Sequence, residues 1–152
     1  MMKRKQGNLI ELAQNGQFDV IVHGCNCWCE MGAGIAKAIR QAFPEAYQAD
    51  QQTEPGDRSK LGTCTEAVIE QDGHRLVVVN AYTQFNYRPE AGKVLVDYEA
   101  VRSSMRWIGN RHAGLRIGLP KIGAGLAGGD WTCISQIIET ELGGEDLTLV
   151  EL

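Results

Sequence analysis

Glycine is concentrated in two short stretches of this chain, and each stretch joins an apolar run to a segment with helical spacing. The first stretch, residues 24–34, follows the β-branched run 17–23, and the second, residues 118–129, begins at the end of the apolar run 115–119. Eighteen glycines in 152 residues exceed the typical share of about 7%. Because glycine permits positive φ and close approach to the backbone, the two stretches predict strand–loop–helix junctions open to a ligand. This pattern is typical of an α/β fold.

The rest of the chain alternates strand-like and helix-like segments. Strands are predicted over residues 1–6, 17–23, 64–70, 74–80, 115–119 and 147–152, and helices over residues 9–14, 33–43, 94–111 and 130–142. Pro44 is predicted to end the second helix and Asp130 to cap the last one, whereas residues 51–60 are predicted to form a loop. Asp72 and Gly73 predict a hairpin, and therefore an antiparallel pair in the sheet. We expect one domain, residues 1–152, whose mixed central sheet is covered by helices on both faces.

Composition limits the possible partners and compartments. The 43% of hydrophobic and 22% of charged residues are typical of a soluble globular protein. A net charge of −4 and a pI near 5.4 argue against sequence-blind binding of nucleic acids. The apolar runs are short, and the basic start of the chain is followed by polar residues, so we expect no membrane span and no secretory signal. Five cysteines do not form a secreted disulfide framework, and we expect a cytoplasmic monomer.

The first glycine stretch has the chemistry of an anion site. Residues 32–34, Gly-Ala-Gly, open the predicted helix, where free backbone N–H groups and the positive end of the helix dipole favour a phosphate. The dinucleotide-binding pattern Gly-x-Gly-x-x-Gly is absent because residue 37 is a lysine, and no P-loop motif is present. An ordinary tight turn at a helix start is the alternative at this point. The second stretch has the same arrangement, and two such loops side by side can enclose a diphosphate with backbone donors alone.

The side chains of the first stretch suggest either a metal site or a catalytic site. Cys25, Cys27, Cys29 and His23 are all possible zinc ligands, but their spacing differs from that of structural zinc sites and no second ligand pair follows. We therefore expect small buried thiols and no metal. His23 titrates near neutral pH and the amide of Asn26 can both donate and accept, so these two residues are the candidate catalytic groups. A structural histidine at a strand end is the alternative.

Four motifs together resemble those of a macrodomain, in order and spacing, over nearly the whole chain. They are GNL at residues 7–9, VIVHGCN at residues 20–26, MGAGIA at residues 31–36 and LPKIGAGL at residues 119–126. The last two are similar to the branch that holds yeast-type ADP-ribose 1''-phosphate phosphatases, terminal ADP-ribose protein glycohydrolases, and small phage and bacterial stand-alone proteins. The resemblance implies a three-layer α/β/α fold and implies ADP-ribose, or a derivative of it, as the partner, with no cofactor.

The resemblance also implies roles for individual residues. Asn8 stands where most macrodomains have an aspartate that binds adenine, and Leu9 follows it. Asn26 matches the asparagine that reaches the distal ribose, and His23 replaces the first asparagine of the common Asn-Ala-Ala-Asn motif. The expected catalytic residues are therefore His23 and Asn26, and the expected ADP-ribose-binding residues are Asn8, Leu9, Gly32, Ala33, Gly34, Ile35, Gly123, Ala124, Gly125, Leu126 and Ala127.

These motifs are compatible with three functions. The leading hypothesis is hydrolysis of ADP-ribose 1''-phosphate to ADP-ribose and phosphate, with His23 as the acid or base and Asn26 orienting the ribose. The second is a module that binds ADP-ribose without turnover. The third is ADP-ribosyl hydrolysis without a lysine, because residues 80–83 contain none and Ala127 stands where the glycohydrolase branch has an aspartate. We therefore expect the covalent lysine mechanism of that branch to be absent.

Overall fold

Strands and helices alternate along the chain as the sequence predicts. The computed structural model describes residues 2–88 and 92–152. The strands are β1 (Lys3–Gln6), β2 (Val20–Cys25), β3 (Cys64–Gln71), β4 (His74–Tyr82), β5 (Arg116–Leu119) and β6 (Asp146–Glu151). The helices are α1 (Leu9–Gln14), α2 (Gly34–Ala42), α3 (Pro44–Gln51), α4 (Tyr98–Arg111) and α5 (Trp131–Leu142), with a short 3₁₀ helix, η1 (Arg58–Lys60).

The six strands form one sheet in the order β1-β6-β5-β2-β4-β3. Neighbouring strands are parallel except for β3 and β4, so the predicted mixed sheet is confirmed. The turn between β3 and β4 contains Asp72 and Gly73 at φ values of 48° and 76°, as a tight hairpin requires. Because β2 lies between β4 and β5 and is parallel to both, the carboxyl ends of these three strands meet at one end of the sheet.

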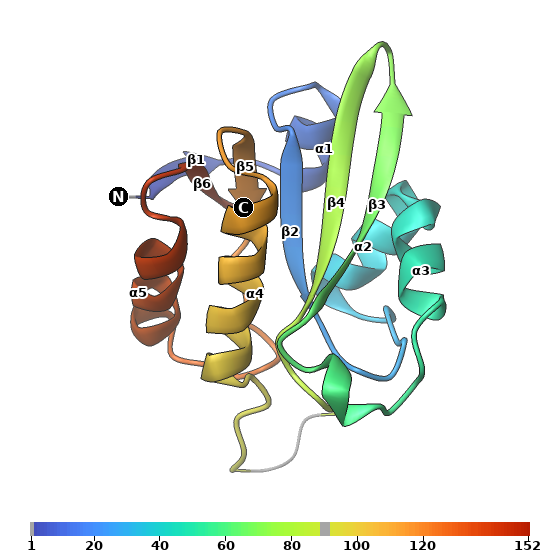
Figure 1. Cartoon of the computed structure of the whole chain (residues 1–152), viewed down its shortest axis with the longest axis vertical. Helices are drawn as coiled ribbons and strands as arrows, with labels where there is room; N and C mark the ends of the chain where they lie inside the picture. Colours follow the sequence, from blue (N-terminus) through green and yellow to red (C-terminus); the bar gives the residue numbers. More distant parts are fainter. Residues whose placement is uncertain (1, 89–91) are drawn as a thin grey trace.

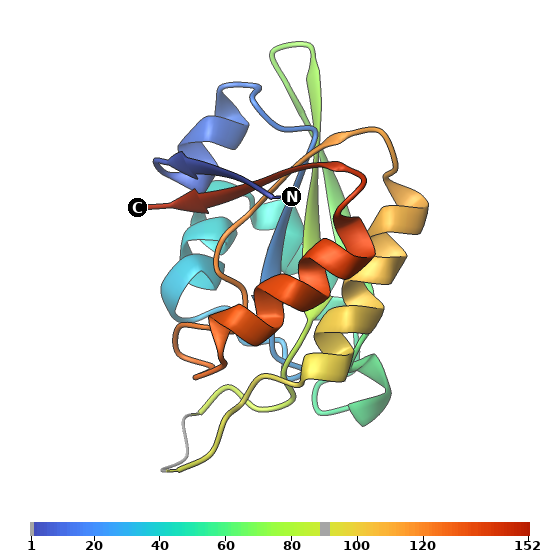
Figure 2. The same ribbon diagram turned by 90° about the vertical axis from the view of Figure 1, so that its left-hand side faces the viewer.

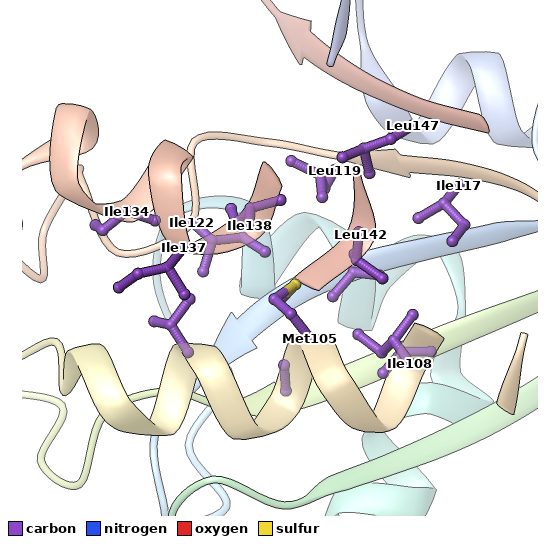
Figure 3. Close-up of a cluster of buried hydrophobic side chains, with 14 of the residues drawn as sticks. Met105, Ile108, Ile117, Leu119, Ile122, Ile134, Ile137, Ile138, Leu142 and Leu147 are labelled. Atoms are coloured by element: carbon purple, nitrogen blue, oxygen red, sulfur yellow. The ribbon is translucent and has the colours of Figure 1, made fainter. Parts of the chain in front are cut away.

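Helices cover both faces of the sheet, with α1–α3 on one side and α4 and α5 on the other (Figures 1 and 2). Alternation along the central strands divides the core between these faces. Val20 and Val22 of β2 pack with α4 and α5, whereas Ile21 packs with α1–α3. Figure 3 shows the first of these two cores, to which α4 contributes Met105 and α5 contributes Ile138. The predicted three-layer α/β/α fold is confirmed.

Pro44 both follows one helix and begins the next. The prediction that helix α2 stops here is confirmed, since its last residue is Ala42. The sequence analysis missed α3, in which Pro44 is the first residue, and it missed η1 within the predicted loop 51–60. Proline suits a first helical position because the N–H that it lacks has no partner there. It therefore marks a boundary between two helices.

Other differences concern the ends of elements. The helix predicted from residue 94 begins at Tyr98, because Val96 instead pairs with Gln84 in an isolated antiparallel bridge. The strand predicted from residue 17 begins at Val20. Residue 1 of the first predicted strand lies outside the described residues, and that strand begins at Lys3. In the described part of the chain, no helix is long and apolar enough to cross a membrane.

Candidate functional site

A cavity of about 540 Å³ lies where the carboxyl ends of β2, β4 and β5 meet. Its walls come from the loop after β2 with the start of α2, from the segment after β4, and from the loop after β5. The lining residues are Gly24, Cys25, Asn26, Glu30, Gly32, Ala33, Gly34, Ile35, Ala36, Gln84, Tyr87, Pro120, Lys121, Ile122, Gly123, Gly125, Leu126 and Ala127. The volume is within the usual range of about 300–1,000 Å³ for small-molecule sites. The structure thus brings the two predicted glycine loops to one cavity.

Four of the five glycines that line this cavity are of two kinds. Gly34 and Gly123 have φ values of 58° and 75°, a backbone conformation that itself favours glycine. Gly32 and Gly125 lie outside that left-handed region, and a Cβ added to either would meet no protein atom within 4 Å. The fold therefore has no need of glycine at these two positions. Their open backbone leaves space in the cavity wall that a ligand can approach closely.

The first turn of α2 leaves backbone donors open to the cavity. Its N-cap residue, Ala33, makes no side-chain hydrogen bond to the first turn, whereas Asn8, Asp97 and Asp130 cap α1, α4 and α5. Residues 33–36 all line the cavity. Uncapped N–H groups at the positive end of a helix dipole favour an anion. This wall can therefore receive a phosphate without a basic side chain.

Asn26 lies in the cavity wall, where its own loop orients the amide. Nδ2 donates to the carbonyl oxygen of Glu30 at 2.7 Å, and Oδ1 accepts from the N–H of Trp28 at 2.8 Å. An amide side chain has two N–H groups and two oxygen lone pairs. These two bonds leave one donor and one acceptor position of a rotationally fixed amide for a ligand.

His23 does not line the cavity, and its side chain is fully buried. Its Nε2–H donates to Oδ1 of Asn80 at 2.6 Å; this tautomer follows because Nδ2 of Asn80 already donates to the carbonyl oxygen of Ala46. Burial lowers the pKa of His23 to about 4, although the hydrogen bond with Asn80 acts in the opposite direction. The ring is therefore neutral and enclosed near pH 7. This burial favours the structural alternative for His23, whereas its role as acid or base at the substrate stays a prediction.

The three neighbouring cysteines are free thiols. Cys25 and Cys27 are buried, as expected, and Cys29 is half-buried. Burial raises the pKa of Cys25 well above its usual range and that of Cys27 to about 11. Cys25 lines the cavity, but as a neutral thiol it is a poor nucleophile. Among residues 2–88 and 92–152, no three His, Cys, Asp or Glu side chains are grouped as a metal site requires.

Three of the predicted binding residues do not line the cavity. Oδ1 of Asn8 accepts from the N–H groups of Ile10 at 3.0 Å and Glu11 at 3.1 Å, which uses both of its lone pairs at the start of α1. Leu9 is buried in the core on the α1–α3 side, and Ala124 packs against the other core. A helix cap thus occupies the acceptor oxygen of Asn8, and the expected contact of this residue with adenine stays a prediction.

The cavity also contains side chains that the sequence motifs did not indicate. Gln84 and Tyr87 follow β4 in a segment without glycine, so the glycine pattern gave no signal for them. Gln84 directly follows residues 80–83, the region where the glycohydrolase branch is expected to carry its lysine. Glu30 and Lys121 are the charged side chains among the described lining residues, and Nζ of Lys121 lies 3.3 Å from Glu151. Both lie within the two glycine-rich stretches, and this position was the available signal.

The chain is similar to a known family and to proteins of several organisms. A family model described as Macro domain matches residues 22–138. An uncharacterized 17.5 kDa protein from the tk-vs intergenic region of Enterobacteria phage T4 is 32% identical over 156 residues, covering 99% of this chain and 96% of that protein. An ADP-ribose 1''-phosphate phosphatase of Candida albicans is 27% identical over 122 residues, covering 76% of this chain and 77% of that enzyme. The solved structure of a protein of unknown function from Bacteroides thetaiotaomicron has a TM-score of 0.74 at 26% identity, with 99% of each chain covered.

Proposed function

The chain belongs to the Macro domain family, and on this premise we propose that it binds ADP-ribose and hydrolyses ADP-ribose 1''-phosphate to ADP-ribose and phosphate. The observation that carries the proposal is the open backbone of Gly32 and Gly125, which the fold does not require and which lines the cavity. The similarity to an ADP-ribose 1''-phosphate phosphatase of Candida albicans supports the choice of reaction.

The two glycine loops are suited to a diphosphate between them. A Cβ on Gly34 would lie 4.0 Å from the side chain of Leu126, so the loops approach each other across the cavity. One loop supplies the uncapped first turn of α2 and the other supplies backbone around Gly125. Backbone donors can hold the charge of a diphosphate although the chain carries a net charge of −4. The distal ribose then lies at Asn26, whose fixed amide supplies one donor and one acceptor to its hydroxyl groups.

Hydrolysis of the 1''-phosphate requires a water molecule, a proton acceptor and a held leaving group. Water attacks phosphorus, the bond from phosphorus to the 1''-oxygen breaks, and that oxygen leaves with ADP-ribose as a hydroxyl. We assign proton transfer from water to the leaving oxygen to Glu30, because this residue lines the cavity next to Asn26, to which its backbone carbonyl is bonded, whereas His23 does not line the cavity. The backbone N–H groups of the second loop stabilise charge on the phosphate.

A second candidate function is binding of ADP-ribose without turnover. The burial of His23 favours it, because the histidine expected to act as acid or base is kept out of the cavity. The third candidate is removal of ADP-ribose from a modified macromolecule by a route without lysine. The presence of Gln84, rather than a lysine, in the cavity wall after β4 is compatible with such a route.

Calorimetry followed by product analysis separates these candidates. ADP-ribose should bind more tightly than AMP, because only ADP-ribose spans both loops and reaches Asn26; equal affinities would contradict the proposed site. Release of inorganic phosphate from ADP-ribose 1''-phosphate is the expected activity. Binding without phosphate release would favour the binding module. Release of ADP-ribose from a modified peptide or oligonucleotide, without phosphatase activity, would favour the third candidate.

A further inference from the structure

The hydroxyl group of Thr83 is fully buried and has no hydrogen-bond partner among the described residues. In this part of the chain, Oγ of Ser104 is the other buried side-chain oxygen or nitrogen without a partner. By contrast, the hydroxyl groups of Thr53 and Thr63 each donate to a backbone carbonyl oxygen at 2.6 Å. Most buried polar side-chain atoms in proteins are paired, so each exception calls for an explanation.

The backbone of Thr83, the first residue after β4, is held on both sides. Its N–H donates to the carbonyl oxygen of Cys25 at 3.2 Å, and its carbonyl oxygen accepts from the N–H of Asp97 at 2.8 Å. A valine has the same shape as threonine and would fill this place without burying an unpaired polar group, which costs free energy. A partner that arrives with a ligand would offset this cost.

The hydroxyl oxygen itself lies directly behind the cavity wall. A Cβ added to Gly24 would be 2.7 Å from Oγ1 of Thr83 and 3.2 Å from Cγ2 of Ile122. Gly24 and Ile122 both line the cavity. Unlike Gly34 and Gly123, Gly24 does not have a positive φ, so the close approach of the Thr83 hydroxyl is what requires glycine there. The hydroxyl is thus one residue layer away from the cavity.

The part of the proposed ligand nearest to this hydroxyl is the distal ribose. Asn26, assigned above to that ribose, follows Gly24 by two residues, which span at most about 7 Å of chain. The contact at Gly24 places Oγ1 of Thr83 in the same region of the wall. A threonine hydroxyl and the hydroxyl groups of a ribose can each donate and accept, so they can pair with one another.

From this placement we propose that Thr83 is a specificity-determining residue, covered in the free protein, whose hydroxyl binds the distal ribose. The inference rests on the ADP-ribose binding proposed above, but not on the phosphatase reaction. In the complex, the side chain of Ile122 shifts away from Gly24, and Oγ1 of Thr83 forms a hydrogen bond with a ribose hydroxyl. Ile122 directly precedes Gly123 of the loop assigned to the diphosphate, so one loop both binds the diphosphate and uncovers Thr83. The added hydrogen bond favours ADP-ribose over ADP, which has no distal ribose.

Calorimetry with ADP-ribose and ADP on the full chain tests the proposal. Thr83→Val keeps the shape of the side chain, so its affinity for ADP-ribose should fall about three- to tenfold through loss of one hydrogen bond. Its affinity for ADP should stay within about twofold of the wild type. Thr83→Ser keeps the hydroxyl and should restore most of the affinity for ADP-ribose. The urea midpoint of ligand-free Thr83→Val should equal or exceed that of the wild type, because an unpaired buried hydroxyl is removed.

Ser104→Ala is the matched control, because it removes the other unpaired hydroxyl, on α4, from a residue that does not line the cavity. It should keep the wild-type affinities for both ligands. An unchanged affinity of Thr83→Val for ADP-ribose, or an equal loss for ADP-ribose and ADP, would overturn the inference. A lower urea midpoint of Thr83→Val would also overturn it, because the hydroxyl would then have a partner in the free protein. Failure of the wild-type protein to bind ADP-ribose would reject the proposed function, and the inference with it.

Discussion

His23 of β2 and Asn80 of β4 face each other across the sheet and are joined by a hydrogen bond of 2.6 Å, with both side chains fully buried. Asn80 also donates to the carbonyl oxygen of Ala46 in α3 and to Oγ1 of Thr65 in β3. One polar network thus connects two central strands, an edge strand and a helix. His23 lies two residues before the end of β2, and the loop that carries Asn26 begins directly after that strand.

Removal of the imidazole should reduce stability. His23→Ala leaves Oδ1 of Asn80 buried without its donor and creates a cavity, so the free energy of unfolding should fall by at least about 2 kcal/mol. Urea denaturation of His23→Ala, Asn80→Ala and the double variant measures the coupling between the two side chains. If His23→Ala kept wild-type stability but lost turnover, the result would support the catalytic role of His23 expected from the sequence.

The burial of His23 also predicts a dependence of stability on pH. Its pKa in the folded protein is lowered to about 4, below the ordinary value of 6.5, so protonation favours the unfolded chain. The contribution of His23 is complete above pH 6.5 and is lost as the pH falls toward 4, by up to about 3 kcal/mol. Unfolding curves of the wild type and His23→Gln across this range measure it. Parallel curves for the two proteins would contradict the prediction.

A side chain added at the open cavity glycine Gly125 should leave folding unchanged but should weaken the binding of ADP-ribose. Gly125→Val meets no protein atom at Cβ and requires no left-handed backbone, so the variant should fold normally. Its branched side chain would occupy the space assigned to the diphosphate, and the affinity for ADP-ribose should fall at least about tenfold. Gly144→Val is the matched control, because Gly144 is equally open and does not line the cavity. Equal affinities of the two variants would remove Gly125 from the binding site.

Asn26→Ala should weaken both binding and turnover. In the proposed complex the amide would contact the ribose in the bound substrate and in the transition state, so its loss should raise KM and lower kcat/KM. An affinity loss of about three- to tenfold is expected for the hydrogen bonds removed. The same variant also frees the carbonyl of Glu30 and the N–H of Trp28, so its melting temperature must be measured alongside.

Glu30→Gln should separate catalysis from binding. If the carboxylate accepts the proton of the attacking water, phosphate release should fall by about 10²–10⁴-fold while the affinity for ADP-ribose stays close to that of the wild type. Glu70→Gln, at an exposed position on β3, is the control for loss of one negative charge. Unchanged phosphate release in Glu30→Gln would show that Glu30 does not accept the proton of the attacking water.

The burial of His23 follows from its place on a face of strand β2, before the strand ends. Because side chains alternate along a strand, His23 lies on the same face as Ile21, toward α1–α3. The two-residue period of a strand predicts that His23 shares a face with Ile21, whereas the catalytic role was expected from the motif at residues 20–26. Asn26 follows the last residue of β2, where alternation no longer applies, and it does line the cavity.

Glycine placement predicted the two loops well, because strand–glycine–helix junctions are local features of the sequence. The third wall of the cavity could not be predicted in this way. Gln84 and Tyr87 reach it because β4 lies beside β2 in the sheet, and strand order is a property of the whole fold. At Asn8 the structure shows a local role as helix cap, and the expected contact with a ligand stays a prediction.

The pairing of β1 with β6 has a consequence for synthesis of the chain on the ribosome. Lys3 is in register with Thr148, so β1 must wait for its neighbour until nearly all of the other strands have been translated. Its four residues remain exposed even in the finished sheet, and the three positive charges of residues 3–5 discourage pairing with other nascent chains meanwhile. The strands that carry the cavity, β2, β4 and β5, all emerge before β6. The binding loops can therefore begin to assemble co-translationally, before the far edge of the sheet is closed.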